Sequence, residues 1–381
     1  MVDATPPPQP ALAPPVIERP AANEVSYGVV SGVAAPGVRR LVIRVDGRVL
    51  RTVELRRRSF TVRVQAPTGE RTVRVETLTG KGARSSRVVR NVFFLPTAAA
   101  PRLRAQRLDA ILARGLERRL KAFRGSAAAY VENLATGYGA AWNSRASFPA
   151  ASTLKLAIAV TALARLEETP SRGSRLDRLI RGALVVSDNV ASNQLEATFG
   201  GSVSGGSALV NAMMRSIGLV DSEMFGGYIP GTLIAGDRRL ATHAARIPHR
   251  VDEQPAWGRG KRTTAYDLAI LARSIWLASG GLGPLRRSQP WFTPKDARYL
   301  LYVLAQVRDG GKLDRRVSGI GGLAVLHKAG WIKGARHDNG LVVYPGGVFV
   351  ACVMTHGAGA GPASDVLAGE IALAALRRFR G

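Results

Sequence analysis

The order of helical and strand-like patterns in the C-terminal part of the chain constrains its fold most strongly. From about Arg102 onward, a helical pattern is followed by two strand-like runs, a long and mainly helical middle, three more strand-like runs and a final helix. The runs cover residues 127–132, 139–142, 323–327, 340–344 and 347–354. Joining the first two to the last three would give a five-stranded antiparallel sheet with the terminal helices on one face. We therefore predict an α+β domain over residues 102–381, in which the middle of the sequence forms a separate helical lobe.

A purely strand-like pattern precedes this part. Short β-branched runs recur between about Ala22 and Leu95, at 41–45, 49–55, 60–64, 72–75 and 88–94. Asp46-Gly47 separates two of them and is a strong hairpin signal, because glycine accepts the positive φ of a type I′ turn. The spacing favours an all-β, immunoglobulin-like sandwich domain over residues 22–96. Seven prolines among the first 21 residues predict a disordered tether before it, and residues 96–101 resemble a linker.

The charge of the chain is strongly positive. Its 54 Lys and Arg residues against 27 Asp and Glu give a formal net charge of +27, which favours polyanionic partners such as nucleic acid, anionic lipid or an acidic wall polymer. The competing explanation is an arginine bias spread over the solvated surface, since only eight of the basic residues are lysines. Residues 22–96 carry 15 basic and 5 acidic side chains, which would suit either a docking face for an anionic polymer or a soluble spacer. In so arginine-rich a chain each lysine is of interest, because lysine can be deprotonated for catalysis and arginine cannot.

Several other features of the sequence limit the classes of function that are possible. No run of 18 apolar residues suggests a membrane span. Cys352 is the single cysteine, which excludes an intrachain disulfide. The five histidines show no metal-ligand spacing and no Gly-rich phosphate loop follows a strand, so we expect neither a metal nor a cofactor. No leader-like start is visible, which leaves open a cytoplasmic protein or a chain whose leader has been removed.

The first candidate catalytic motif is Ser152-Thr153-Leu154-Lys155, at the start of the apolar helical run 156–166. Residues three apart share a helix face, so Lys155 can reach the Ser152 hydroxyl, and the helix N-terminus favours negative charge developing there. A neutral lysine could then act as the general base for a serine nucleophile. The alternative is a serine that merely caps the helix.

Two further motifs follow in the sequence. Ser187-Asp188-Asn189 leads into a helical run, and Lys328 lies in His327-Lys328-Ala329-Gly330-Trp331 at the end of a predicted strand. Each has an ordinary explanation, a helix cap in the first case and an edge lysine before a turn in the second. Together, in this order and in these structural contexts, the three motifs match the signatures of penicillin-recognising serine enzymes.

The chain from about Arg102 to its end resembles the class A β-lactamase family and its penicillin-binding relatives. The resemblance rests on residues 148–156, on Ser-Asp-Asn-x-Ala-x-Asn-x-Leu at 187–195 and on residues 263–269. It implies a β-lactam or cell-wall peptide substrate, an acyl-enzyme intermediate and an extracytoplasmic location. A nucleic acid partner is not expected.

The resemblance also implies roles for individual residues. Ser152 would attack the amide carbonyl, Lys155 would activate it, and Ser187 would relay a proton to the leaving nitrogen. Asn189 would hold Lys155 and the substrate amide, while Lys328 would attract the substrate carboxylate. The backbone N–H groups of Ser152 and Trp331 would form the oxyanion hole, and Asp188 would brace the loop.

Two departures from the family pattern bear on function. Ala329 stands where the family usually has a hydroxyl residue, and Arg336 is a candidate to supply the missing contact to a substrate carboxylate. No Glu-x-x-Leu-Asn motif provides the family's deacylating glutamate, which leaves Glu253 as the candidate base. We therefore expect slow deacylation. The alternative function is a catalytically weak module that binds an anionic cell-wall polymer.

Overall fold

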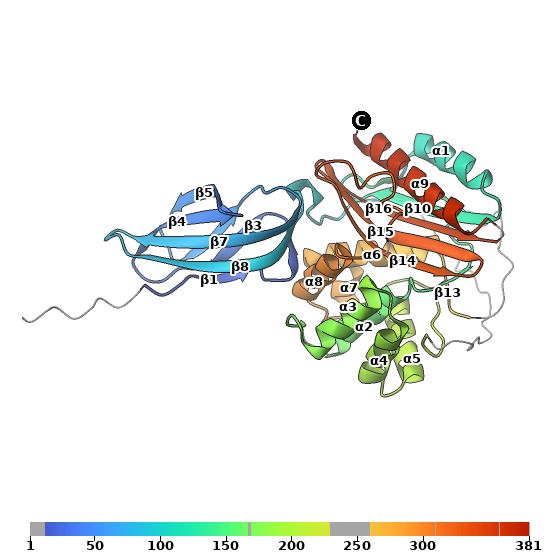
Figure 1. The fold of residues 1–381 in the computed structure, drawn as a ribbon, viewed down its shortest axis with the longest axis horizontal. Helices are drawn as coiled ribbons and strands as arrows, with labels where there is room; N and C mark the ends of the chain where they lie inside the picture. Colours follow the sequence, from blue (N-terminus) through green and yellow to red (C-terminus); the bar gives the residue numbers. More distant parts are fainter. Residues whose placement is uncertain (1–11, 167–168, 229–259, 309, 358, 381) are drawn as a thin grey trace, which may run out of the picture. The chain divides into compact units, whose positions relative to one another are not determined.

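The computed structural model describes residues 12–166, 169–228, 260–308, 310–357 and 359–380. The chain divides into two compact units, one ending at Leu95 and the other beginning at Pro96 (Figure 1). Glu253 lies outside the described residues.

The N-terminal unit is an all-β sandwich, as predicted. Its strands are β1 (Val16–Arg19), β2 (Glu24–Ser26), β3 (Val29–Val33), β4 (Val38–Val45), β5 (Arg48–Glu54), β6 (Ser59–Arg63), β7 (Gly69–Thr79) and β8 (Arg84–Phe94). They form one sheet in the order β1-β3-β6 and a second in the order β2-β8-β7-β4-β5. Val30 and Phe60 of the first sheet share a buried core with Leu41, Ile43 and Val75 of the second. The immunoglobulin-like topology remains a prediction.

The predicted hairpin at Asp46-Gly47 is confirmed. Val45 pairs with Arg48, and both turn residues have positive φ, 47° at Asp46 and 81° at Gly47. The N-terminal tether needs a correction, because β1 lies inside the segment predicted to be disordered. Gly32 explains the pairing of β1 with β3, since a Cβ at Gly32 would lie 2.0 Å from the carbonyl oxygen of Val16.

The central sheet of the C-terminal unit has the order β14-β15-β16-β10-β11-β9. Its strands are β9 (Arg107–Leu108), β10 (Ser126–Asn133), β11 (Tyr138–Trp142), β14 (Ala324–Ile332), β15 (Ala335–Tyr344) and β16 (Gly347–His356). The five predicted strands are all present and antiparallel. Strand β9 adds a sixth, parallel to β11, which the sequence did not indicate because a two-residue strand has no periodicity.

Helices cover both faces of this sheet (Figure 1). The terminal helices α1 (Ala110–Lys121) and α9 (Pro362–Arg380) share a buried core with one face, as predicted. Helix α6 (Ala265–Ser279) packs against β10, β15 and β16. The predicted helical lobe contains α2 (Lys155–Leu166), α3 (Arg175–Val185), α4 (Asn189–Gly200), α5 (Val203–Ser216), α7 (Gly283–Ser288) and α8 (Pro294–Leu304). A search of the described residues finds no helix with the length and apolarity needed to cross a membrane.

The segment that opens the C-terminal unit contains a short helix. Residues Thr97–Ala99 form a 3₁₀ helix, and the Ala99 carbonyl accepts a hydrogen bond of 2.8 Å from Nε1 of the buried Trp276 on α6. Residues 96–101, expected to be a linker, therefore contribute contacts to the C-terminal unit.

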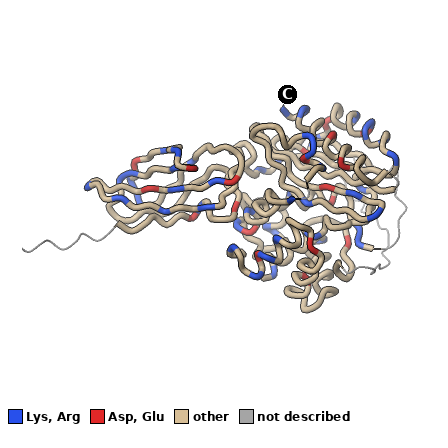
Figure 2. The backbone as a smooth tube through the Cα atoms, viewed as in Figure 1, with Lys and Arg blue, Asp and Glu red and all other residues tan. Residues whose placement is uncertain are grey.

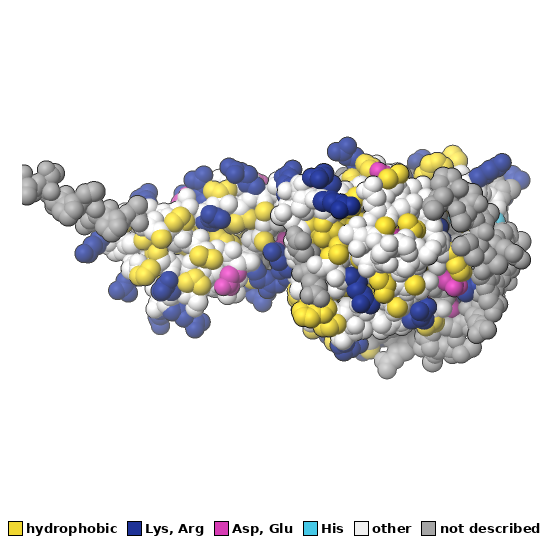
Figure 3. All heavy atoms as spheres, turned by 90° about the horizontal axis from the view of Figure 1, so that it is seen from below, with side chains coloured by type: hydrophobic (Ala, Val, Ile, Leu, Met, Phe, Trp, Pro, Cys, Tyr) yellow, Lys and Arg dark blue, Asp and Glu magenta, His cyan; other side chains and the backbone are white. Residues whose placement is uncertain are grey.

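Charged side chains are spread widely over both units. Lys and Arg residues occur along the strands and helices throughout the described chain (Figure 2). On the face shown in Figure 3 they lie scattered among apolar and uncharged side chains. This distribution fits an arginine bias spread over the solvated surface.

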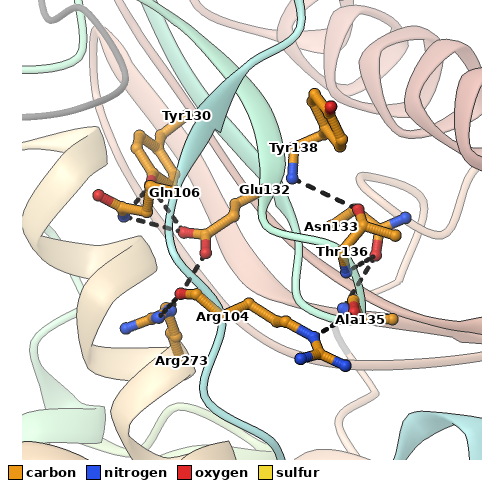
Figure 4. A network of polar contacts seen from close by, with 9 residues as sticks. All are labelled: Arg104, Gln106, Tyr130, Glu132, Asn133, Ala135, Thr136, Tyr138 and Arg273. Atoms are coloured by element: carbon orange, nitrogen blue, oxygen red, sulfur yellow. Dashed lines mark hydrogen bonds and ion pairs between the residues drawn. The ribbon is translucent and has the colours of Figure 1, made fainter.

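A buried carboxylate ties helix α6 to the sheet (Figure 4). Glu132 on β10 is fully buried, and its Oε2 accepts hydrogen bonds from Tyr130 (2.8 Å) and from Gln106 (3.1 Å). Its Oε1 lies 3.2 Å from Nε of Arg273 on α6. Arg273 also donates to the carbonyl of Arg104, 3.4 Å away. The network therefore fixes the sheet, the helix and the segment before α1 relative to one another.

We expect Glu132→Ala to destabilise the C-terminal unit by about 3 kcal/mol, because it leaves the largely buried guanidinium of Arg273 without its anion. Chemical unfolding of the variant and the wild type measures the difference. Glu117→Ala, which removes the exposed ion pair with Lys121, is the control and should cost less than about 1 kcal/mol. Equal effects of the two changes would contradict a structural role for the Glu132 network.

Candidate active site

The turn that carries Ser152 is tightly constrained. Strand β12 (Phe148–Pro149) leads into it and α2 begins at Lys155. The amide of Thr153 and its hydroxyl both donate to the Ala150 carbonyl, at 3.2 and 2.6 Å. Ala151 has a φ of +48°, a conformation that costs free energy for a residue with a side chain. The half-buried Ser152 is therefore held immediately before the helix, as the sequence predicted.

Strand β15 and the loop that carries Lys261 hold this turn from outside. His337 on β15 donates from Nε2 to the Pro149 carbonyl at 2.7 Å, while its Nδ1 accepts from the Thr355 amide at 3.3 Å. Burial lowers the pKa of His337 to about 4, so the ring is neutral at pH 7. The Ala150 amide donates to the carbonyl of Lys261, 2.8 Å away.

Strand β14 approaches the backbone of the turn very closely. A Cβ built on Gly330 would lie 2.8 Å from the Ser152 nitrogen and 2.9 Å from the Thr153 nitrogen. Because any side chain at Gly330 would clash with backbone atoms, glycine is required for this approach. The strand that carries Lys328 thus lies directly against the amide of the candidate nucleophile.

The ammonium of Lys155 is buried in a set of oxygen acceptors. Its Nζ donates to Oδ1 of Asn189 at 2.6 Å and to the backbone carbonyl of Ser187, and it lies 3.4 Å from the Ser187 hydroxyl. Ser187 has a φ of +60°, which turns its carbonyl and side chain toward the site. Among the described residues, Ser152 Oγ has no hydrogen-bond partner, so Lys155 contacts the Ser187 loop and not the hydroxyl that the motif spacing predicted.

A second buried lysine completes this cluster. Lys328 on β14 is 1% exposed, and its Nζ donates to the Ser187 hydroxyl at 3.0 Å and to the Ala329 carbonyl at 2.7 Å. The Ser187 hydroxyl therefore lies between two ammonium groups. Burial, and next the charge of Lys328, lower the pKa of Lys155 to about 7, while Asp188 opposes the shift and Lys261 adds to it. A substantial fraction of Lys155 is consequently neutral near pH 7.

Asp188 caps helix α4. Its Oδ1 accepts hydrogen bonds from the amides of Val190 (2.7 Å) and Ala191 (3.3 Å). These bonds fix the start of the helix, where Asn189 is the first residue. The contacts of Asp188 are those of the structural brace that the sequence suggested.

The remaining predicted residues lie apart from this cluster or are engaged elsewhere. Trp331 follows Gly330 on β14, and its side chain is 61% exposed. The guanidinium of Arg336 forms an ion pair with Asp365 at the start of α9. Its proposed contact with a substrate carboxylate would require this ion pair to open, and that role stays a prediction. Nothing in the described part of the chain groups three or more His, Cys, Asp or Glu side chains into a metal site.

Sequence reasoning missed three residues beside Lys155. The ring of Tyr228 contacts the ammonium groups of both Lys155 and Lys261, and Lys261 is faced by Glu196. Lys261 is one of only eight lysines in the chain, and that scarcity is the sequence signal that could have singled it out. No motif links the three residues, because they come from α4 and from two different loops.

The sheet with its terminal helices and the helical lobe bring the three separated motifs together. The model of the Beta-lactamase enzyme family matches residues 110–174 and 167–379. The chain therefore belongs to the β-lactamase enzyme family. A comparison with curated protein sequences finds no match.

Solved structures resemble the C-terminal unit in fold. PBP-A has a TM-score of 0.55 and 19% identity, covering 72% of this chain and 98% of its own. The β-lactamase from Sphaerobacter thermophilus DSM 20745 has a TM-score of 0.53 and 19% identity, covering 71% and 98%. An ancestral class A β-lactamase has a TM-score of 0.53 and 20% identity, covering 70% and 100%. At these identities the likeness establishes the fold.

Proposed function

We propose that this protein is an acyl-transferring serine hydrolase that forms an ester at Ser152 with β-lactams or with peptide amides of the cell wall. The observation that carries the proposal is the buried Lys155, which has a pKa of about 7 and shares the Ser187 hydroxyl with Lys328. A lysine that is partly neutral at pH 7 can act as a general base. A relative in fold, a variant of PBP-A, is described as an acyl-enzyme complex with penicillin G.

In the acylation step, the neutral amine of Lys155 takes the proton of Ser152 as Oγ bonds to the carbonyl carbon. The amide C–N bond then breaks, and Ser187 passes a proton from the Lys155 ammonium to the leaving nitrogen. The 3.4 Å separation of Lys155 Nζ from Ser187 Oγ supports this relay. Lys155 must turn toward Ser152 for the first transfer, since hydrogen bonds at an active site often tighten only when substrate is bound.

The developing oxyanion would be stabilised by the backbone N–H groups of Ser152 and Trp331. The close approach of Gly330 to the Ser152 nitrogen supports this pairing, because Trp331 is the next residue along β14. Lys328 would attract the substrate carboxylate, and Asn189 would orient Lys155 while contacting the substrate amide. We also propose that the protein acts outside the cytoplasm, as the family suggests.

Deacylation is proposed to be slow. Water needs a base within hydrogen-bond reach to attack the ester, and such a base contributes about 10²–10⁴-fold in rate. The family's Ω-loop glutamate motif is missing, and Glu253, the candidate replacement, lies outside the described residues. A long-lived adduct should therefore accumulate.

The test is a nitrocefin time course at stoichiometric enzyme, combined with intact-mass measurement after exposure to benzylpenicillin. We expect a burst of about one equivalent, a slow second phase and a protein mass raised by one penicillin. Rapid multiple turnover that Glu253→Gln abolishes would refute slow deacylation and identify the base. The absence of any adduct and any turnover would refute the serine hydrolase.

The alternative is a weak catalyst that serves to bind an anionic wall polymer through its β-sandwich. A groove of about 550 Å³ on the five-stranded sheet is lined by Arg40, Arg44 and Arg84, by the carboxylate of Glu76 and by apolar and hydroxyl side chains. Two of these arginines are already paired, Arg40 with Glu54 and Arg44 with Glu76. Neither the family nor the related structures point to a polymer partner, so this function stays a prediction.

A further inference from the structure

The ring of Tyr228 is in contact with two lysine ammonium groups. Nζ of Lys155 lies 4.8 Å from the ring centroid and Nζ of Lys261 lies 4.7 Å from it. The two nitrogens are therefore within about 10 Å of each other, which is one Debye length at moderate ionic strength. Two cations at this separation in a largely buried site repel each other, so the charge of one disfavours the charge of the other.

The position of Tyr228 is fixed by helix α4. Its backbone amide donates to Oδ1 of Asn193 at 2.6 Å. Its hydroxyl is buried and has no hydrogen bond among the described residues, whereas its ring contacts the two lysines. The Tyr228 ring thus contacts both ammonium groups.

Glu196, two turns after Asn189 on α4, provides the anion for Lys261. Its Oε1 accepts from the Ser207 hydroxyl at 2.7 Å, whereas Oε2 is buried and has no hydrogen bond among the described residues. The charge of Glu196 raises the pKa of Lys261 against the lowering effect of burial. Gly227 allows the chain before Tyr228 to lie close to helix α4, since a Cβ at Gly227 would lie 2.7 Å from Oδ1 of Asn193. Burial raises the pKa of Glu196 to about 7, so its carboxylate form, which favours the charged form of Lys261, predominates above that pH.

Each charged group near Lys155 either favours or disfavours the ammonium form of this lysine. Lys328 and Lys261 disfavour its ammonium form, Asp188 favours it, and the Tyr228 face also attracts a cation. Lys328 is proposed to contact the substrate, so its removal would impair binding as well. Lys261 has no proposed contact with the substrate, so it can be changed to examine the electrostatic effect separately.

We infer that Lys261 is a positioning residue that acts through space on Lys155 and favours the neutral form that acylation requires. The inference rests on the proposed function, because it assigns a role to a neighbour of the proposed general base. Lys261 itself does not touch the reacting atoms.

The first test is the pH dependence of acylation by a fluorescent penicillin in Lys261→Met, with Lys261→Arg as the charge-preserving control. Loss of the cation raises the pKa of Lys155, so the acid limb of the profile should move upward by roughly half a pH unit to one unit. Acylation should fall about 3- to 10-fold at pH 6 and stay within about twofold of wild type at pH 9, while Lys261→Arg follows the wild type. An acylation rate that falls equally at all pH values would overturn the inference. An acid limb at the same pH as in the wild type would also overturn it.

The second test does not depend on activity. Lysine labelled with ¹³C at Cε gives one NMR signal for each of the eight lysines, and the signal lost in Lys155→Arg assigns Lys155. The titration midpoint of Lys155 should rise in Lys261→Met. The same rise is expected in Lys261→Gln, which replaces the methionine variant if that variant does not fold. An unchanged midpoint in a folded variant would overturn the inference. If the wild type forms no adduct while the midpoint moves, the proposed function fails and the electrostatic inference stands.

Discussion

Ser152→Ala is expected to remove acylation by benzylpenicillin completely, because the neighbouring hydroxyl of Thr153 is buried and already donates to the Ala150 carbonyl. Stability should change by less than about 0.5 kcal/mol, since the Ser152 hydroxyl makes no hydrogen bond among the described residues and alanine fits the turn. Intact-mass spectrometry detects the adduct, and a thermal unfolding curve reports the stability.

The matched control for this change is Ser318→Ala, at an exposed serine remote from the motifs. This variant should carry the same adduct as the wild type. A penicillin adduct on Ser152→Ala would contradict the assignment of the nucleophile. A missing adduct together with a lowered unfolding temperature would mean that the turn, and not the hydroxyl, had been lost.

Lys155→Arg is expected to lower the rate of acylation by about 10³-fold, near the middle of the range for loss of a general base. Arginine preserves the positive charge and can still donate to Asn189 and the Ser187 carbonyl. It cannot become neutral, however, and so cannot accept the proton of Ser152. Stopped-flow acylation rates between pH 6 and 9 measure the effect.

The pH profile distinguishes this explanation from a packing defect. Wild-type acylation should fall as the pH drops below about 7, where Lys155 becomes protonated, whereas the variant should be slow at every pH. Lys121→Arg, at the exposed end of α1, is the control and should behave as the wild type does. Undiminished acylation by Lys155→Arg would refute the general-base role.

The sequence predicted which motifs would meet, although they are far apart in the chain. Ser187 and Lys328 are separated by 141 residues, yet Lys328 Nζ lies 3.0 Å from the Ser187 hydroxyl. The prediction was possible because each motif stood at the boundary of a recognisable helix or strand, and the order of those elements allowed a single antiparallel sheet. The resemblance to a known family then indicated that the motifs at these boundaries lie together in one site.

Other features could not be predicted in this way. The ion pair of Arg336 with Asp365 joins a strand to a helix that no local pattern connects. The same holds for Glu132 and Arg273, whose contact depends on how α6 packs against β10. Strands β1 and β9 also escaped prediction, because four or two residues are too few to show a period.

The sequence by itself determined the two-part architecture, the antiparallel sheet and the residues Ser152, Lys155, Ser187, Asn189 and Lys328 as a candidate set. Periodicity and motif spacing are local properties, so they can be read without coordinates. The tertiary structure alone decided that Lys155 is buried against Lys328, with Tyr228, Lys261 and Glu196 beside it. The protonation state of a lysine depends on burial and on charges within a few ångströms, and those neighbours come from segments that only the packed fold brings together.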